Sequence, residues 1–278
     1  MNGLTTVNIE LTNRCNKSCH MCGRRKAEKN FPELAQAYNK DMSFEVLQKL
    51  AQEIPPGIVI QFHNNGEPTV FPELKAALDL FPNNIKCFNT NAKLLVKKAG
   101  DIIGNLDSLT ISVIQDDDES ERQYEIVKEF LAIKGDRKPF MIYRLLGEVS
   151  KYHDKDGKYH YEENRTKRWH ELPGLVCTRI LHNPMGSFNY TRKVTIPEIG
   201  VCLDLLNHLA VDVDGNVSFC VRFDPNRHGV LGNILENTLE ELWHSQKRTK
   251  IVMEHLKGNR NCNPLCSNCH FYGCPTGM

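Results

Sequence analysis

The chain has 278 residues with 40% apolar and 25% charged side chains, so it is long enough to bury a substantial core. Its formal net charge of +1 gives no electrostatic argument for nucleic acid as a partner. No segment approaches the roughly 20 apolar residues of a membrane span, and the first residues lack the pattern of a secretory signal. We therefore expect a cytoplasmic protein with no nucleic-acid or membrane partner.

Short β-rich runs alternate with helical patterns through the first 185 residues. The runs are near-continuously apolar, which is typical of strands buried on both faces of a parallel sheet. They cover Val7–Leu11, Ile58–His63, Ile85–Asn89, Ser108–Val113, Phe140–Leu145 and Val176–Leu181. Amphipathic helices are predicted between them, one after the N-cap candidate Ser43 and one ending at Gly135. The alternation predicts an α/β fold, doubly wound or a partial (β/α)6 TIM-like barrel, that binds ligands at the carboxyl ends of its strands.

The rest of the chain has a different pattern. Residues 146–172 are strongly charged and predict a solvated loop, an exposed helix or a lid. Residues 208–223 predict a β-hairpin that turns at Asp214-Gly215. One helix is predicted from the capping box of Thr238 and Glu241 to Gly258. We expect two domains, residues 1–190 and 191–278.

Eleven cysteines in a chain expected in the cytoplasm need an explanation, because disulfides belong to oxidising compartments. Three of them, Cys15, Cys19 and Cys22, form a C-x3-C-x2-C motif directly after the first predicted strand. Structural zinc commonly takes four tetrahedral ligands, whereas an iron–sulfur cube held by three thiolates keeps one iron open. The motif therefore favours a reactive metal centre.

This motif resembles the signature of the radical S-adenosylmethionine (radical SAM) enzymes. The resemblance implies a [4Fe–4S] cluster whose open iron is chelated by the amino and carboxylate groups of SAM. Reductive cleavage of SAM then gives a 5′-deoxyadenosyl radical, which abstracts hydrogen from a substrate. Met21 replaces the aromatic residue often found before the last cysteine of the motif.

Further segments at predicted strand ends match the same family. Residues 64–68, "NNGEP", are similar to its GGEP turn, which receives the SAM ammonium, and residues 89–95, "NTNAKLL", to its TNG-x-L-L segment. Two departures are Asn65 for the first glycine and Ala92 for the glycine of TNG. The resemblance implies SAM contacts from Asn65, Gly66, Glu67, Pro68, Thr90, Asn91, Ser112, Gln115 and Arg144, in addition to Met21.

Cys202 and Cys220 form a C-x12-G-x4-C motif around the predicted hairpin. This spacing resembles the opening of the SPASM extension, or Twitch in its shorter form, which binds auxiliary [4Fe–4S] clusters. The tail departs from the SPASM pattern, because Cys262, Cys266, Cys269 and Cys274 are spaced C-x3-C-x2-C-x4-C. The simplest interpretation is one auxiliary cluster on Cys202, Cys220, Cys266 and Cys269. The alternatives are Cys274 as a ligand, two clusters with open irons, or structural zinc.

The resemblance to enzymes with one auxiliary cluster implies a small polar substrate, such as a sugar or aminocyclitol, that is oxidised, epimerised or rearranged. The early position of the first motif leaves no room before it for a leader-peptide-binding domain. Candidate catalytic residues are His182 and Glu198 as acid–base groups and Cys177 as a hydrogen donor, although a lone cysteine is more often a core residue. A flavodoxin or ferredoxin is the expected reducing partner. The alternative functions are a maturase of peptide or protein side chains and a non-catalytic metal-binding module.

Overall fold

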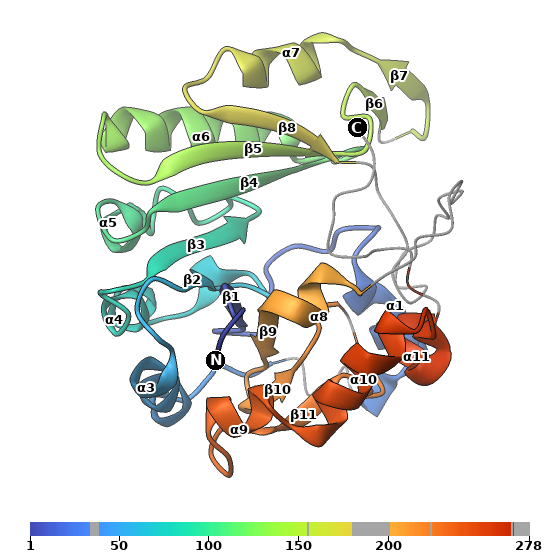
Figure 1. The fold of residues 1–278 in the computed structure, drawn as a ribbon. Helices are drawn as coiled ribbons and strands as arrows, with labels where there is room; N and C mark the ends of the chain where they lie inside the picture. Colours follow the sequence, from blue (N-terminus) through green and yellow to red (C-terminus); the bar gives the residue numbers. More distant parts are fainter. Residues whose placement is uncertain (34–38, 155, 180–200, 223, 268, 270–278) are drawn as a thin grey trace.

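The structure is a computed structural model, and it describes residues 1–33, 39–154, 156–179, 201–222, 224–267 and 269. Its central feature is a curved sheet of parallel strands that follow one another in chain order (Figure 1). The parallel strands are β1 (Thr6–Ile9), β2 (Val59–Gln61), β3 (Ile85–Thr90), β4 (Ser108–Ile114), β5 (Phe140–Leu146) and β8 (Leu175–Arg179). All six predicted strands are therefore confirmed over the residues described, as is the partial-barrel α/β fold.

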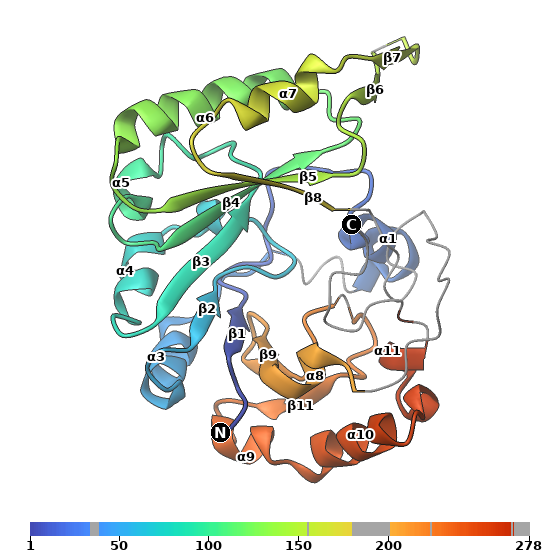
Figure 2. The same cartoon turned by 45° about the horizontal axis from the view of Figure 1, so that its top comes forward.

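Helices cover the outer face of this sheet (Figures 1 and 2). They are α3 (Phe44–Glu53), α4 (Leu74–Asp79), α5 (Ala99–Ile102) and α6 (Ser120–Lys134). The Ser43 hydroxyl accepts the Val46 amide at 3.3 Å and so caps α3, as its sequence predicts. Gly135 ends α6 with a φ of 57°, which a glycine adopts without steric cost. Apolar side chains such as Val7, Ile9 and Leu47 are fully buried between the two layers.

Residues 146–172 are not a plain loop. They form the hairpin β6 (Lys151–His153) and β7 (Tyr159–Tyr161), followed by helix α7 (Asn164–His170). Trp169 on α7 is fully buried and packs edge-on against Tyr124 of α6, with 5.2 Å between the ring centroids. The charge pattern hid this helix, because its arginines Arg165 and Arg168 are buried and reach Glu121 of α6.

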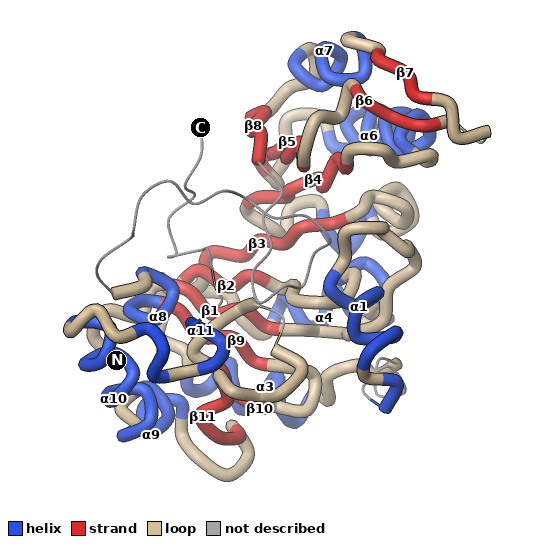
Figure 3. Tube along the Cα trace, turned by 90° about the vertical axis from the view of Figure 1, so that its right-hand side faces the viewer, coloured by secondary structure: helices blue, strands red, loops and turns tan. Residues whose placement is uncertain are grey.

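The C-terminal segment continues the sheet at its β1 edge. Strand β9 (His208–Val211) pairs in parallel with β1 and in antiparallel fashion with β10 (Asn216–Ser218), which pairs with β11 (Val230–Asn233). The predicted hairpin is therefore confirmed, and Gly215 has the positive φ of 82° that its turn requires. Figure 3 shows the strands from β11 to β8 along one arc. The predicted boundary at 190/191 lies outside the described residues.

Helices complete this segment around the outer edge of the hairpin. They are α8 (Leu203–Asn207), α9 (Leu239–Trp243), α10 (Gln246–Leu256) and α11 (Pro264–Ser267), with a 3-10 turn at Arg260–Cys262. Another 3-10 turn, Pro68–Val70, follows β2. The capping box of Thr238 and Glu241 is present. The prediction of one helix up to Gly258 is wrong, because Ser245 caps a second helix through the Arg248 amide. No described helix is long and apolar enough to cross a membrane.

Candidate active site and metal centres

The first three cysteines lie in the loop that leaves β1 and leads into helix α1 (Gly23–Asn30). All three thiols are half-buried, and the Cys22 amide donates to the Cys19 carbonyl at 3.1 Å, which turns the loop back on itself. Burial and the neighbouring Cys22 and Cys15 raise the pKa of the Cys19 thiol to about 12. The raised pKa disfavours the Cys19 thiolate in the apo loop, and a bound cation would stabilise it.

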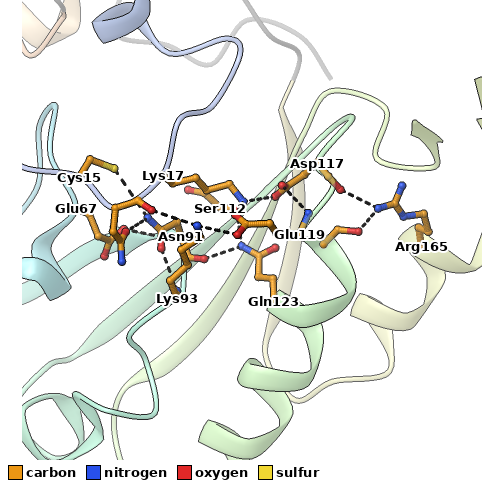
Figure 4. Close-up of polar contacts among 12 residues, drawn as sticks. Cys15, Lys17, Glu67, Asn91, Lys93, Ser112, Asp117, Glu119, Gln123 and Arg165 are labelled. Atoms are coloured by element: carbon orange, nitrogen blue, oxygen red, sulfur yellow. Dashed lines mark hydrogen bonds and ion pairs between the residues drawn. The ribbon is translucent and has the colours of Figure 1, made fainter. Parts of the chain in front are cut away.

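Polar contacts fasten this loop to the carboxyl ends of β3 and β4 (Figure 4). The Asn91 side-chain amide donates to Asn16 Oδ1 at 2.9 Å and lies 4.0 Å from Cys15 Sγ. Lys17 forms ion pairs with Asp117 at 2.5 Å and Glu119 at 3.3 Å. The loop is therefore positioned from two neighbouring strand ends. Sequence reasoning overlooked Lys17, because a charge inside a cysteine loop looks like an exposed one.

Gly66 lies where the turn after β2 meets the cysteine loop. A Cβ at this position would lie 1.9 Å from the carbonyl oxygen of Thr12 and 2.9 Å from that of Arg14. The next amide, Glu67 N, donates to the Arg14 carbonyl at 2.8 Å. Glycine is therefore required for the close approach of two backbones. The preceding Asn65 amide donates to Glu10 Oε1 at 2.9 Å, which ties the turn to the end of β1.

The Glu67 carboxylate joins this turn to the end of β3. Oε1 accepts the hydroxyls of Thr90 and Thr69 at 2.6 and 2.7 Å, and Oε2 accepts the Asn91 amide at 2.8 Å. Burial raises the pKa of this carboxyl, while the hydrogen bonds act in the opposite direction. Pro68 begins the 3-10 turn that Glu67 caps. Two motifs far apart in the sequence therefore form one unit.

The segment after β3 keeps the left-handed turn that its sequence pattern requires. Ala92 has a φ of 67°, a conformation that favours the glycine of the related motif. The Ala92 amide donates to the Thr90 hydroxyl at 3.0 Å. The departure at Ala92 therefore leaves the backbone of the motif in place.

Two of the predicted SAM contacts, Ser112 on β4 and Arg144 on β5, lie side by side on neighbouring strands. Ser112 is in register with Arg144, and Arg144 with Cys177 of β8. Gln123 of α6 holds this edge to β3 by donating to the Ser112 carbonyl at 2.9 Å and to the Asn91 carbonyl at 3.1 Å. The Gln115 side-chain oxygen accepts the Glu148 amide at 2.8 Å, so it supports the turn after β5.

A polar cavity of about 820 Å³, open to solvent, lies between the turn after β2 and the C-terminal hairpin. Its lining includes Glu10, Asn64, Asn65, Asp212, Cys220 and Arg222. Burial and the Asp212 carboxylate raise the pKa of Glu10 to about 7, although backbone amides lower it. The cavity borders both the turn that resembles the SAM-binding motif and a cysteine of the second cluster.

A second pocket, of about 340 Å³, is lined by four cysteines: Cys202, Cys220, Cys266 and Cys269. Burial raises the pKa of the Cys266 thiol to about 12 and that of Cys220 well above its usual range. Asn263 positions Cys266 by accepting its amide at 2.9 Å. Cys262 is not part of the lining, and Cys274 lies outside the described residues.

The donor set of this pocket fits a metal cluster. The ten cysteines that the structure describes are free, so the thiols that meet here are not used for disulfides. His255 also lines the pocket, and its buried Nε2 has no hydrogen-bond partner among the described residues. A bound iron–sulfur cluster would be ligated by the four thiols and would give the unpartnered His255 Nε2 a hydrogen-bond partner.

The remaining predicted site residues do not all lie in the part of the chain that the structure describes. Met21 is half-buried in the first loop, next to Cys22. Cys177 is half-buried on β8. His182 and Glu198 lie outside the described residues, so their roles stay predictions. No sequence pattern pointed to His255, since a single histidine on a polar helix is indistinguishable from a surface residue.

Comparisons with known proteins support this description. Residues 202–270 match the SPASM family, an iron–sulfur cluster-binding domain. An S-adenosyl-L-methionine-dependent 2-deoxy-scyllo-inosamine dehydrogenase from Niallia circulans is 24% identical over 95% of this chain and 92% of its own length. The 7,8-dihydro-6-hydroxymethylpterin dimethyltransferase of Methanocaldococcus jannaschii is 36% identical over 47% of this chain, which spans about a quarter (26%) of that relative.

The crystal structure of BtrN in complex with AdoMet and 2-DOIA has the same fold, with a TM-score of 0.57 and 18% identity. The match covers 99% of this chain and 96% of that one. The fold, the C-x3-C-x2-C loop, the strand-end motifs and the SPASM match agree with one another, and [4Fe–4S] clusters and SAM are the cofactors they indicate. Residues 202–270 therefore match the SPASM iron–sulfur domain, and the chain as a whole is similar to radical SAM enzymes in its motifs and fold.

Proposed function

We propose that the protein cleaves SAM reductively and abstracts hydrogen from a small polar metabolite, such as a sugar or aminocyclitol. The observation that carries this proposal is the polar cavity between the turn after β2 and the C-terminal hairpin. It borders Asn65 of the turn that resembles the SAM-binding motif and Cys220 of the second centre. A substrate in it would lie between the source of the radical and an electron acceptor.

Cys15, Cys19 and Cys22 would hold the first [4Fe–4S] cluster, and Cys202, Cys220, Cys266 and Cys269 an auxiliary one. When the first cluster and SAM are both bound, they would supply a 5′-deoxyadenosyl radical. Gly66 and Glu67 hold the turn that would receive the SAM amino group. Ser112 and Arg144 would present polar groups to the ribose and carboxylate of SAM.

Polar side chains of this cavity, such as Glu10, Asn64 and Asp212, would hold the substrate, and further polar side chains lie in the barrel interior. The Asn8 amide donates to the His63 carbonyl at 2.9 Å, and Asn8 Oδ1 contacts His208. Burial and the nearby Arg144 lower the pKa of His63 to about 3, so its imidazole is neutral and able to accept a hydroxyl hydrogen bond. The full-length coverage of the dehydrogenase relative favours oxidation among the possible reactions.

The test is an anaerobic assay with SAM, a reductant and panels of carbon-deuterated aminocyclitols, sugars and short peptides. We expect a small polar compound to raise 5′-deoxyadenosine above its substrate-free level and to transfer deuterium into it. Deuterium transfer from a peptide alone would favour a maturase instead. Absence of SAM cleavage by a fully iron-loaded protein would leave only a metal-binding role.

A further inference from the structure

Helix α10 places one histidine against the four-cysteine pocket. His255 is 0% exposed, lines the pocket and lies on the buried face of the helix together with Ile251. Buried imidazoles normally use both ring nitrogens for hydrogen bonds. His255 uses one of them among the residues that the structure describes.

The contact of the first nitrogen fixes the position of the ring proton. The Cys202 backbone amide donates to His255 Nδ1 at 3.5 Å. A nitrogen that accepts a hydrogen bond carries no proton, so a neutral ring must carry its proton on Nε2. His255 therefore presents an N–H donor at Nε2.

This donor has no acceptor among the described side chains and backbone groups. Nε2 is buried and unpartnered. Leu205, Phe219 and Leu265 contribute apolar atoms to the pocket wall. The carboxylate of the wall, Asp204, already faces His208 at 3.8 Å and Arg222 at 3.5 Å. Among the described residues that line the pocket, the side-chain acceptors that remain are the cysteine sulfur atoms.

We propose that His255 donates a hydrogen bond from Nε2 to a sulfur of the auxiliary cluster, either a cysteine thiolate or an inorganic sulfide. The same geometry argues against His255 as an iron ligand. A ligating Nε2 carries no proton, and its ring would then have to donate from Nδ1. Here Nδ1 faces the Cys202 amide, which is itself a donor.

The hydrogen bond has a measurable consequence for the cluster. Hydrogen bonds to cluster sulfurs stabilise the reduced, more negative state and raise the reduction potential. Loss of the His255 donor should therefore lower the midpoint potential of the auxiliary cluster. The first cluster should not respond, because the contacts of its loop described above involve no residue of α10.

The test is a redox titration followed by electron paramagnetic resonance on the anaerobically reconstituted full chain. Cys15/Cys19/Cys22→Ala protein identifies the auxiliary signal as the one that remains. Two variants remove the donor, His255→Phe and His255→Met, so that one can replace the other if it folds poorly. His255→Gln restores an N–H donor of similar reach. His244→Phe, at an exposed position after α9, is the matched control.

We expect each variant to keep the iron content of the wild type. The auxiliary midpoint should fall in His255→Phe and His255→Met, return toward the wild-type value in His255→Gln, and stay unchanged in His244→Phe. An unchanged midpoint in both donorless variants overturns the proposal. If both His255→Met and His255→Gln lose iron or show a three-iron signal, the proposal is also overturned. That result would mean that the His255 ring is an iron ligand and not a hydrogen-bond donor.

The inference rests on the auxiliary centre of the proposed function, but not on its substrate. Wild-type protein without auxiliary iron would refute that centre itself. A loaded centre with an unresponsive midpoint would refute the hydrogen bond alone.

Discussion

The Lys17 ammonium lies 2.5 Å from the Asp117 carboxylate, although the two residues are 100 positions apart in the chain. Their side chains are only 8% and 4% exposed. Lys17 lies between Cys15 and Cys19, while Asp117 lies in the turn between β4 and α6. The pair therefore fastens the first cysteine loop to the strand end that would face SAM. A second bond from the Arg165 guanidinium to the Asp117 carbonyl, at 3.0 Å, holds the turn from the other side.

Removal of one partner leaves a buried charge without compensation. We expect Lys17→Met to lower the free energy of unfolding by about 3–5 kcal/mol and to speed the loss of iron to a chelator. The double variant Lys17→Met/Asp117→Asn should recover part of this loss, because neither charge remains. Anaerobic denaturation curves measure the free energy of unfolding of the single and the double variant. Lys40→Met, which breaks a half-exposed pair with Asp214 at 3.0 Å, is the control and should cost less than about 1 kcal/mol. Equal effects of Lys17→Met and Lys40→Met would contradict the role of the buried pair.

Gly66→Ala tests the close approach of the turn to the cysteine loop. The added Cβ would meet backbone oxygen of Thr12 and Arg14, which cannot move aside as a flexible side chain can. We expect the turn to shift and the affinity for SAM, measured by anaerobic equilibrium dialysis, to fall at least about tenfold, which corresponds to about 1.4 kcal/mol. Gly100→Ala has no atom within 4 Å of the new Cβ and should bind SAM as the wild type does. Unchanged binding by Gly66→Ala would show that the turn does not position SAM.

Glu10 should make stability depend on pH. Its pKa is raised from 4.5 to about 7 in the folded chain, mainly by burial. Between these values the unfolded chain releases the proton while the folded chain keeps it, so the free energy of unfolding falls as pH rises. The change is about 1.4 kcal/mol per pH unit, or about 3 kcal/mol in all.

Glu10→Gln isolates this contribution, because the amide does not titrate and keeps an acceptor for the Asn65 amide. Relative to that of the wild type, the free energy of unfolding of the variant should rise by up to about 3 kcal/mol between pH 4.5 and 7. Denaturation of both proteins across this range measures the difference, and other titrating groups cancel. A difference that does not change with pH would mean that Glu10 titrates normally.

The auxiliary ligand set can be tested by counting iron. We expect Cys220→Ala and Cys266→Ala to lose about four iron atoms relative to the wild type, because each removes a thiolate of one cube. Cys262→Ala should keep its iron, since this thiol is not part of the four-cysteine pocket. Iron loss from Cys262→Ala, or retention in Cys220→Ala, would require a different ligand set.

The sequence predicted the six parallel strands and helices α3 and α6 because their apolar periodicity reflects burial directly. Val7 and Ile9 of β1 are fully buried, and so are Leu109 and Ile111 of β4. The caps at Ser43 and Thr238 follow from local hydrogen bonds, so they too can be read from short segments. Helix α7 could not be predicted in the same way, because the buried Arg165 and Arg168 depend on partners in α6.

The residues of the candidate site likewise differ in whether the sequence alone can predict them. Spacing identifies the cysteines of the first loop, because Cys15, Cys19 and Cys22 lie within eight residues of the chain. Lys17, Glu10 and His255 are recognised only when their partners are known, namely Asp117, Asn65 and the second pocket. The split of the last helix at Ser245 was equally hidden, because one capping serine amid good helix formers carries little weight in a sequence pattern.

The central claim is that three cysteines of the first loop hold a cluster that cleaves SAM. The most direct test measures 5′-deoxyadenosine and iron in anaerobically reconstituted wild type and in Cys15/Cys19/Cys22→Ala protein, with SAM and excess reductant. We predict about eight iron atoms and 5′-deoxyadenosine formation in the wild type, against about four iron atoms and no 5′-deoxyadenosine in the variant. Equal 5′-deoxyadenosine from both proteins, or none from fully loaded wild type, would contradict this account.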